Sequence, residues 1–262
     1  MDGLKGKVAI VTGGGTMIGA HVVRAFHREG TKVVVADIDA AGGQAIAGEF
    51  SEGVRFIRTD LGDDKQIAAC VEQTAAAFGG IDFLVNVACI YVDGGLSASR
   101  QDWLDSFNIN VVGGVMMLKA VRPHMIQRGG GAVVNFGSIS AKVAQHGRWL
   151  YPVSKAATLQ LTRNEAMDLA GDKIRVNSVS PGWTWSKVIA ELSKNNRAKA
   201  DSVGAPFHLL GRIGNPEEVA QAVVFLCSSH ASFITGTDLA VDGGYTAMGP
   251  ERAEETIPKL AE

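Results

Sequence analysis

Short runs of apolar, mostly β-branched residues alternate with longer amphipathic segments along this 262-residue chain. The expected strands fall at residues 8–11, 32–36, 54–58, 82–85, 132–137, 175–179 and 239–241. Continuous apolar strands are typical of a sheet buried on both faces, and their alternation with helices favours parallel pairing. The sequence therefore predicts an α/β fold, a doubly wound parallel β-sheet flanked by helices on both faces.

The segments between these strands have helical spacing. The expected helices cover residues 18–28, a segment ending near 50, and residues 64–78, 103–126, 152–169 and 216–228. No Pro- or Ser-rich linker divides the chain, so residues 1–249 are predicted to form a single domain. Residues 183–210 are the least regular part and are expected to form a lid or binding loop, and 250–262 a charged C-terminal tail.

Composition excludes several classes of protein. The formal net charge of −2 gives no electrostatic reason to expect nucleic acid or an acidic membrane as a partner. No apolar run approaches the ~18 residues of a membrane span. The three cysteines are odd in number and lack metal-like spacing, so we expect neither a disulfide framework nor a metal site. With no signal peptide in the sequence, a cytoplasmic location is expected.

A glycine-rich run follows the first expected strand and opens the first helix. Residues 12–19 read Thr-Gly-Gly-Gly-Thr-Met-Ile-Gly. Glycines let a backbone approach a pyrophosphate, and a helix N-terminus offers free N–H groups and a positive dipole end. The alternative is a plain strand-to-helix turn. The context favours a dinucleotide-binding loop and thus a Rossmann-type sheet.

An acidic residue marks the end of the second strand. Asp37 lies about 20 residues beyond the glycine run, where a carboxylate can accept hydrogen bonds from both adenosine ribose hydroxyls. The same carboxylate repels a 2′-phosphate, and no Arg or Lys lies near Thr16 or directly after Asp37 to receive one. NAD is therefore predicted over NADP. A helix N-cap is the alternative role for Asp37.

The expected helix 152–169 is preceded by a Tyr and carries a Lys four residues later. Tyr151 and Lys155 lie on one helical face. A tyrosine hydroxyl is a poor base at neutral pH, and a neighbouring ammonium favours its ionised form. The pair can transfer protons, although the same spacing also occurs on ordinary helices.

Together these features resemble the short-chain dehydrogenase/reductase family from about residue 7 to residue 244. Residues 12–19 match its Thr-Gly-x-x-x-Gly-x-Gly loop, residues 86–89 its Asn-Asn-Ala-Gly motif, and residues 234–244 its closing strand and turn. Asn110, Ser138, Tyr151 and Lys155 match its catalytic tetrad in order and spacing. The resemblance implies cofactor contacts at Gly13, Thr16, Met17, Ile18, Asp37, Ile38, Asp60, Leu61, Asn86, Ala88, Cys89, Tyr151, Lys155, Pro181, Gly182, Thr184 and Ser186.

The resemblance also implies a role for each member of the tetrad. Tyr151 is the general acid/base, and Lys155 holds the cofactor ribose and favours the ionised tyrosine. Ser138 hydrogen-bonds the reacting oxygen. Asn110 positions a water that links Lys155 to solvent. Taken singly, Ser138 is better explained as a strand-end cap, and Asn110 and Lys155 as solvated surface residues. All four residues together in the order of the family favour the catalytic roles.

Three residues depart from the family pattern. Met17 replaces a glycine of the cofactor loop, and Met is flexible enough to turn away from a diphosphate. Val87 and Cys89 replace an Asn and a Gly in the second motif. These changes concern cofactor affinity rather than chemistry, and Cys89 is interpreted as a small packing residue.

The substrate pocket is expected from segments that follow three of these motifs. They contribute Tyr91, Ser140, His146, Trp149, Trp183 and Trp185. Three of the four tryptophans of the chain are in this set, which favours a cyclic, aromatic or hydrophobic secondary alcohol or ketone. Packing in the core or between subunits is the alternative for Trp149 and Trp185. Lys142, Arg148 and Lys187 are either surface charges or receptors for a carboxylate.

The sequence thus predicts an NAD-dependent alcohol dehydrogenase or ketone reductase. An NADP-dependent 3-oxoacyl-thioester reductase is the alternative enzyme, and a low-turnover NAD-binding sensor the alternative from another class. Small and apolar residues on the helices that carry Asn110 and Tyr151 resemble a family interface, so a homotetramer is expected.

Overall fold

A seven-stranded parallel sheet forms the centre of the protein. The computed structural model describes residues 1–250 and 258, so most of the predicted tail lies outside the described residues. The strands are β1 (Val8–Thr12), β2 (Lys32–Asp37), β3 (Val54–Arg58), β4 (Phe83–Asn86), β5 (Gly131–Phe136), β6 (Ile174–Pro181) and β7 (Asp238–Val241). Their order is β3-β2-β1-β4-β5-β6-β7, and every neighbouring pair is parallel. The predicted fold class is confirmed.

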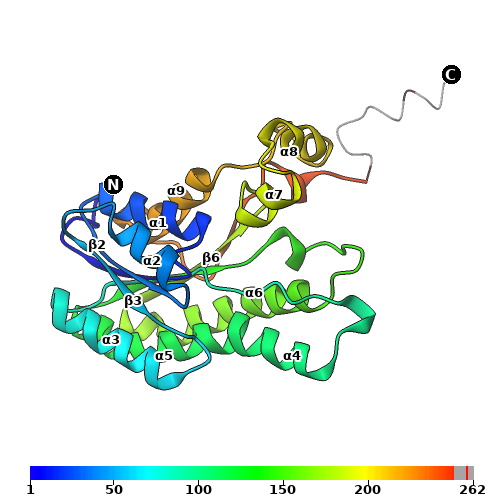
Figure 1. Ribbon diagram of the computed structural model, residues 1–262. Helices are drawn as coiled ribbons and strands as arrows, with labels where there is room; N and C mark the ends of the chain where they lie inside the picture. Colours follow the sequence, from blue (N-terminus) through cyan, green and yellow to red (C-terminus); the bar gives the residue numbers. More distant parts are fainter. Residues whose placement is uncertain (251–257, 259–262) are drawn as a thin grey trace.

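Helices cover both faces of this sheet (Figure 1). One layer holds α1 (Met17–Arg28), α2 (Ala40–Ala47) and α9 (Pro216–Cys227); the other holds α3 (Asp64–Phe78), α4 (Arg100–Phe107), α5 (Gly113–Gln127) and α6 (Leu150–Leu169). Alternate residues of a strand point to opposite faces of the sheet. Ala9 and Val11 pack in the core under α1 and α9, whereas Ile10 packs in the core under α3 and α5. Each strand therefore has to be apolar on both sides.

The predicted helix 103–126 is two helices joined by a π turn. The turn spans Asn108–Val112, and the Gly113 N–H donates to the carbonyl of Asn108. Such wide turns inside helices occur mainly at functional sites. This i→i+5 hydrogen bond inserts one residue into an otherwise continuous helix, and the spacing of apolar residues in the sequence did not show the insertion. The turn contains Asn110.

The region expected to be irregular contains two short helices. They are α7 (Lys187–Leu192) and α8 (Arg197–Gly204), which pack on each other and stand apart from the two layers in Figure 1. Single 3₁₀ turns occur at η1 (Gly95–Ser97), η3 (Ile139–Ala141), η4 (Ala170–Asp172), η5 (Ala205–Phe207), η6 (Ser229–Ala231) and η7 (Tyr245–Ala247). We call residues 183–210 the lid segment.

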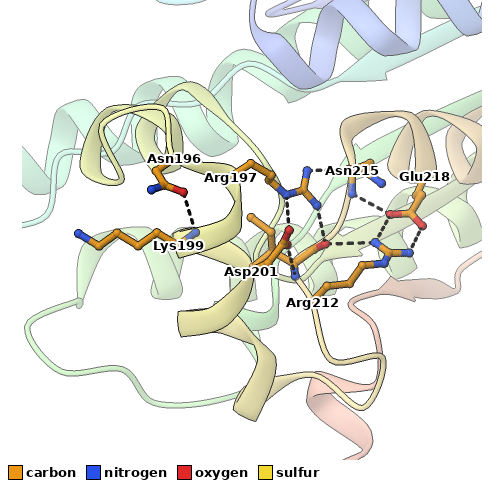
Figure 2. A network of polar contacts seen from close by, with 8 residues as sticks. Asn196, Arg197, Lys199, Asp201, Arg212, Asn215 and Glu218 are labelled. Carbon is orange, nitrogen blue, oxygen red and sulfur yellow. Dashed lines mark hydrogen bonds and ion pairs between the residues drawn. The ribbon is translucent and has the colours of Figure 1, made fainter.

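A polar network attaches the lid segment to the loop before α9 (Figure 2). The Arg197 guanidinium donates to Asp201 at 3.0 Å, to the Asn215 side chain at 2.7 Å and to a backbone carbonyl at 3.1 Å. Arg212 binds both oxygens of Glu218, and this ion pair lowers the pKa of Glu218 to about 2. The network fixes the base of α8 against the body of the protein.

Within residues 1–250 and 258, no helix is long and apolar enough to cross a membrane.

Candidate active site

The glycine-rich loop lies at the carboxyl end of β1, beside the point where the strand order reverses between β1 and β4. Ligands of open α/β sheets bind in the crevice at such a point. Gly13 has a φ of 65°, and a Cβ there would lie 2.8 Å from the backbone of Ala88. A Cβ on Gly19 would lie 2.1 Å from the Gly13 carbonyl oxygen. Only glycine fits at these two positions, which keeps the backbone open to a ligand.

The first turn of α1 offers free donors. Thr16 caps the helix, with its side chain accepting the N–H of Gly19 at 3.2 Å. The N–H groups of Met17 and Ile18 have no hydrogen-bond partner among the described residues. Two free N–H groups at a helix N-terminus suit a diphosphate. The Met17 side chain is half-buried.

Asp37 lies at the end of β2, directly beside this loop. Asp37 is 7% exposed, and one of its carboxylate oxygens accepts the Gly15 N–H at 2.9 Å. The other oxygen accepts the Asp39 N–H at 2.9 Å. The N-cap of α2 is Asp39, so Asp37 is not needed for that role. Ile38 is 55% exposed next to it.

Most of the other predicted cofactor positions lie at or after the ends of three strands, β3, β4 and β6. The Asp60 carboxylate accepts the Gly62 N–H at 2.8 Å, and Leu61 is buried. The Ala88 N–H donates to the Thr12 hydroxyl at 3.3 Å, which ties the second motif to β1. The remaining positions are Asn86 at the end of β4, half-buried Cys89, Pro181 at the end of β6, Gly182, buried Thr184, and Ser186 as the N-cap of α7.

Tyr151 and Lys155 lie together near the start of α6. The two residues are 7% and 3% exposed. The Lys155 ammonium lies 5.5 Å from the centre of the Tyr151 ring and donates to the Phe136 carbonyl at 2.8 Å. The Arg148 guanidinium lies 4.8 Å from the same ring centre. Two cations therefore lie beside the Tyr151 ring.

Asn110 is held inside the π turn by four side-chain hydrogen bonds, one of them a long donation to the Ser106 hydroxyl at 3.4 Å. Its side chain accepts the Ile90 N–H at 2.8 Å and donates to the Ile90 carbonyl at 3.1 Å and to the Ser154 hydroxyl at 3.2 Å. It thereby joins the loop after β4 to α6.

Ser138 follows β5 and is 7% exposed. Its hydroxyl oxygen accepts the Ser140 N–H at 3.1 Å, and the Ser140 hydroxyl donates to Gln145 at 2.7 Å. The Ser138 proton remains available as a donor to a reacting oxygen. The strand-end cap considered as an alternative is therefore present as well, and it orients the hydroxyl.

The sequence reasoning missed Asp93. Its carboxylate accepts the backbone N–H groups of Trp149, Leu150 and Tyr151 at 2.8, 3.2 and 3.2 Å. Trp149, the N-cap of α6, has no side-chain cap of its own. Asp93 thus caps the catalytic helix from a position 56 to 58 residues earlier in the chain, and no local capping signal could have revealed it.

Tyr91 stacks on Tyr151, with ring centres 4.8 Å apart and an angle of 24° between the rings. The residue is 55% exposed. Cys89, desolvation of the hydroxyl end and the adjacent Tyr151 all raise the pKa of Tyr91. Tyr91 therefore stays a neutral phenol beside Tyr151.

The other predicted pocket residues are spread around the lid segment and the start of α6. The Trp183 ring centre lies 5.7 Å from that of Phe207 and 6.5 Å from that of His208. Trp183 also lines a surface pocket of about 340 Å³ that includes no member of the tetrad. The Arg197 guanidinium lies 5.6 Å from the centre of the Trp185 ring. Trp149 and His146 are exposed. Their contact with substrate stays a prediction.

No group of three or more His, Cys, Asp or Glu residues in residues 1–250 and 258 has the arrangement of a metal site.

Residues 15–246 match the family model described as enoyl-(acyl carrier protein) reductase. The chain belongs to the short-chain dehydrogenase/reductase family. The cis-4-hydroxycyclohexanecarboxylate dehydrogenase of Sinomonas cyclohexanicum is 37% identical over 92% of this chain and 97% of its own length. The 2,5-dichloro-2,5-cyclohexadiene-1,4-diol dehydrogenase of Sphingobium indicum is 37% identical over 95% of this chain and 100% of its own.

A solved structure in the family has the same fold. The 3-ketoacyl-(acyl-carrier-protein) reductase from Brucella melitensis, complexed with NADH, is 32% identical and superposes with a TM-score of 0.84 over 93% of this chain and 99% of its own. As a family member, this oxidoreductase uses a nicotinamide cofactor. The open backbone at Gly13 and Gly19 and the free N–H groups at Met17 and Ile18 fit that group.

Proposed function

We propose that this protein is an NAD-dependent dehydrogenase of secondary alcohols, with Tyr151 as general acid/base. The observation that carries the proposal is the surroundings of Tyr151: a buried phenol with the Lys155 and Arg148 cations at its ring. In this proposal the Tyr151 hydroxyl accepts a proton from an alcohol and returns it to a ketone.

Four other residues have separate roles in the proposed reaction. Ser138 donates a hydrogen bond to the substrate oxygen and stabilises the charge that develops on it. Lys155 holds the ribose next to the nicotinamide, and Asn110 orders a water beside Lys155 for proton exchange with solvent. The nicotinamide ring, when bound, accepts or supplies the hydride. Asp93 keeps Tyr151 in place by capping its helix.

The preference for NAD is argued from Asp37. Its carboxylate already receives the Gly15 N–H, so it lies within the loop that would hold the adenosine half of the cofactor. A 2′-phosphate there would place like charges close together in a partly buried site, which is unfavourable. The NADH in the related reductase structure agrees with this preference.

We propose a cyclic or otherwise hydrophobic substrate. The Tyr91 ring beside Tyr151 offers an aromatic contact for a ring-shaped alcohol. The names of the two cyclohexane and cyclohexadiene dehydrogenase relatives support the same class. We also propose that the substrate carries a carboxylate that Arg148 binds, because Arg148 has no ion-pair partner among the described residues.

We also propose a homotetramer in the cytoplasm. Leu104, Val112 and Val153 are apolar and between 43% and 56% exposed on and beside the helices of the active site, and Phe233 near β7 is fully exposed. These positions agree with one interface through the helices and a second at the closing strand. Sedimentation velocity of the purified chain tests the stoichiometry.

The experiment that tests the activity starts with fluorescence titrations against NADH and NADPH. Turnover is then measured with cis-4-hydroxycyclohexanecarboxylate, 4-methylcyclohexanol, an acyclic secondary alcohol and a 3-oxoacyl thioester. We expect tighter NADH binding and turnover of the cyclic alcohols. The Tyr151→Phe variant, which keeps the ring, should bind NADH and lose turnover.

Each other result selects a different function. If the protein binds NADPH more tightly than NADH and reduces the thioester, it is an NADP-dependent 3-oxoacyl-thioester reductase and the proposal is wrong. NADH binding without turnover of any alcohol or ketone would favour the low-turnover sensor. Faster turnover of the carboxylate than of the methyl compound, lost in Arg148→Gln, would assign Arg148 to the substrate.

A further inference from the structure

A tight turn directly before the catalytic helix α6 carries Arg148. Residues 145–148 read Gln-His-Gly-Arg, and the Arg148 N–H donates to the Gln145 carbonyl at 3.3 Å. Gly147 has a φ of 69°, a left-handed conformation that glycine adopts without strain and that some β-turns need at their third residue. The turn folds the chain back, so the side chains of its first and last residues come into contact.

Gln145 holds the Arg148 guanidinium through an uncharged oxygen. The amide oxygen of Gln145 accepts a guanidinium N–H at 3.3 Å and the Ser140 hydroxyl at 2.7 Å. Because a guanidinium has only donors, the amide has to present its oxygen to Arg148, and the Ser140 hydroxyl has to donate to the second lone pair. The Ser140 N–H in turn donates to the Ser138 hydroxyl at 3.1 Å. One amide oxygen thus joins Arg148 to the turn that follows β5.

The described part of the chain leaves the positive charge of Arg148 unpaired. Arg148 is half-buried and forms no ion pair there, although its guanidinium lies 4.8 Å from the centre of the Tyr151 ring. The nearby charges have other partners, since Lys142 pairs with Asp238 at 2.7 Å and Asp93 accepts N–H groups at the start of α6. A guanidinium with unused donors suits the two oxygens of a carboxylate.

We propose that Gln145 is a positioning residue that sets the preference for a negatively charged substrate, because it aims Arg148 at the reaction site without neutralising it. Gln145 acts through Arg148 and does not itself contact the substrate. This inference rests on the proposed function, in which Arg148 binds a carboxylate of the substrate.

Glutamine meets two requirements at this position. Its oxygen holds the guanidinium in one place, which an apolar side chain could not do. Its amide is also uncharged. A glutamate would fit the same space and could still accept from Ser140, but it would form an ion pair with Arg148 and repel a second carboxylate.

The kinetic test compares the intact protein, Gln145→Glu and Gln160→Glu. Gln160 is exposed on α6 and accepts from Arg163 at 3.1 Å, so Gln160→Glu adds the same charge to another Gln–Arg pair outside the candidate site. For each protein, kcat/KM is measured with cis-4-hydroxycyclohexanecarboxylate and with 4-methylcyclohexanol.

The readout is the ratio of these two constants, which a loss of overall stability would not move. We expect the ratio to fall by about ten-fold or more in Gln145→Glu, the order expected for loss of a hydrogen bond to a charged group. In Gln160→Glu the ratio should be unchanged. Equal ratios in all three proteins would overturn the proposal.

A double variant tests whether Gln145 acts through Arg148. Arg148→Gln should already have lost the preference for the carboxylate, so adding Gln145→Glu should change the ratio by less than about two-fold. If the added charge lowers the ratio as much as it does in the presence of Arg148, it acts on the substrate directly and the proposal is wrong.

A second measurement does not depend on turnover. Isothermal titration calorimetry of the NADH complex compares cyclohexanecarboxylate with the neutral cyclohexanecarboxamide. The intact protein and Gln160→Glu should bind the carboxylate about ten-fold more tightly, and Gln145→Glu should bind the two compounds about equally. A preference that Gln145→Glu keeps, or that the intact protein lacks, refutes the role of Gln145 even if the protein oxidises alcohols. The expected preference in a protein that oxidises no alcohol would refute the dehydrogenase alone.

Discussion

Replacing Asp93 by Ala would remove the cap of the catalytic helix. Its carboxylate receives three N–H groups at 2.8, 3.2 and 3.2 Å, and α6 has no other side-chain cap. Loss of an N-cap costs roughly 0.5–2 kcal/mol, and loss of a negative charge at a helix N-terminus roughly 0.3–1 kcal/mol. With three donors affected, we expect the free energy of unfolding to fall by about 2 kcal/mol, equivalent to a Tm lower by roughly 4–8 °C.

The same change should reduce turnover, because one of the three donors is the N–H of Tyr151 itself. Displacement of a reacting group by about 1 Å costs on the order of 100-fold in rate. We expect kcat to fall about 10- to 100-fold with little change in NADH affinity. Asp93→Asn retains an acceptor oxygen and should recover part of both losses.

Asp63→Ala is the matched control. Asp63 caps α3 by accepting the N–H groups of Lys65 and Gln66, on a helix that carries no member of the tetrad. Urea unfolding and steady-state kinetics are measured on both variants. The reasoning is refuted if Asp93→Ala keeps its kcat, or if it loses no more stability than about 0.5 kcal/mol.

Other residues give further predictions. Asp37→Ala should weaken NADH at least ten-fold and narrow the gap to NADPH in a fluorescence titration; an unchanged ratio would mean that another group selects the cofactor. Arg197→Ala should raise KM for the alcohol several-fold while sparing kcat, since its bonds anchor the lid segment, and equal effects on both constants would contradict this. Because the pKa of Glu165 is raised to about 7 in the folded protein, its contribution to stability is complete below pH 4.5 and is lost as the pH rises through 7. Glu165→Gln should remove this dependence, worth up to about 3 kcal/mol, and urea midpoints at pH 5 and 8 that change as in the intact protein would refute it.

Local patterns were enough for the fold. The expected strand 54–58 and helix 64–78 have the observed bounds, because turn residues and caps stand next to each apolar run. The order of the strands, β3-β2-β1-β4-β5-β6-β7, came from the structure alone. The prediction of one unbroken α-helix over 103–126 was wrong in one respect, since a single inserted residue at the π turn is too local to be recognised from the spacing of apolar residues.

Some residues of the candidate site could be predicted from the sequence, and others only from the structure. Residues with a role tied to a motif could be predicted from the sequence, and their roles stay predictions: Gly13, Asp37, Ser138, Tyr151 and Lys155. Asp93 was not found, because it acts on a helix that begins 57 residues later, through hydrogen bonds that only the fold brings about.

The sequence by itself determined the alternation of strands and helices, the cofactor loop and the order of the tetrad, because each depends on residues close together in the chain. The tertiary structure decided which distant groups share one environment. It placed Arg148 and Tyr91 at the Tyr151 ring and Asp93 at the start of α6. It also buried Glu165 against the Asn135 side chain. Burial and distance set these electrostatic relations, and neither is a property of a local stretch of sequence.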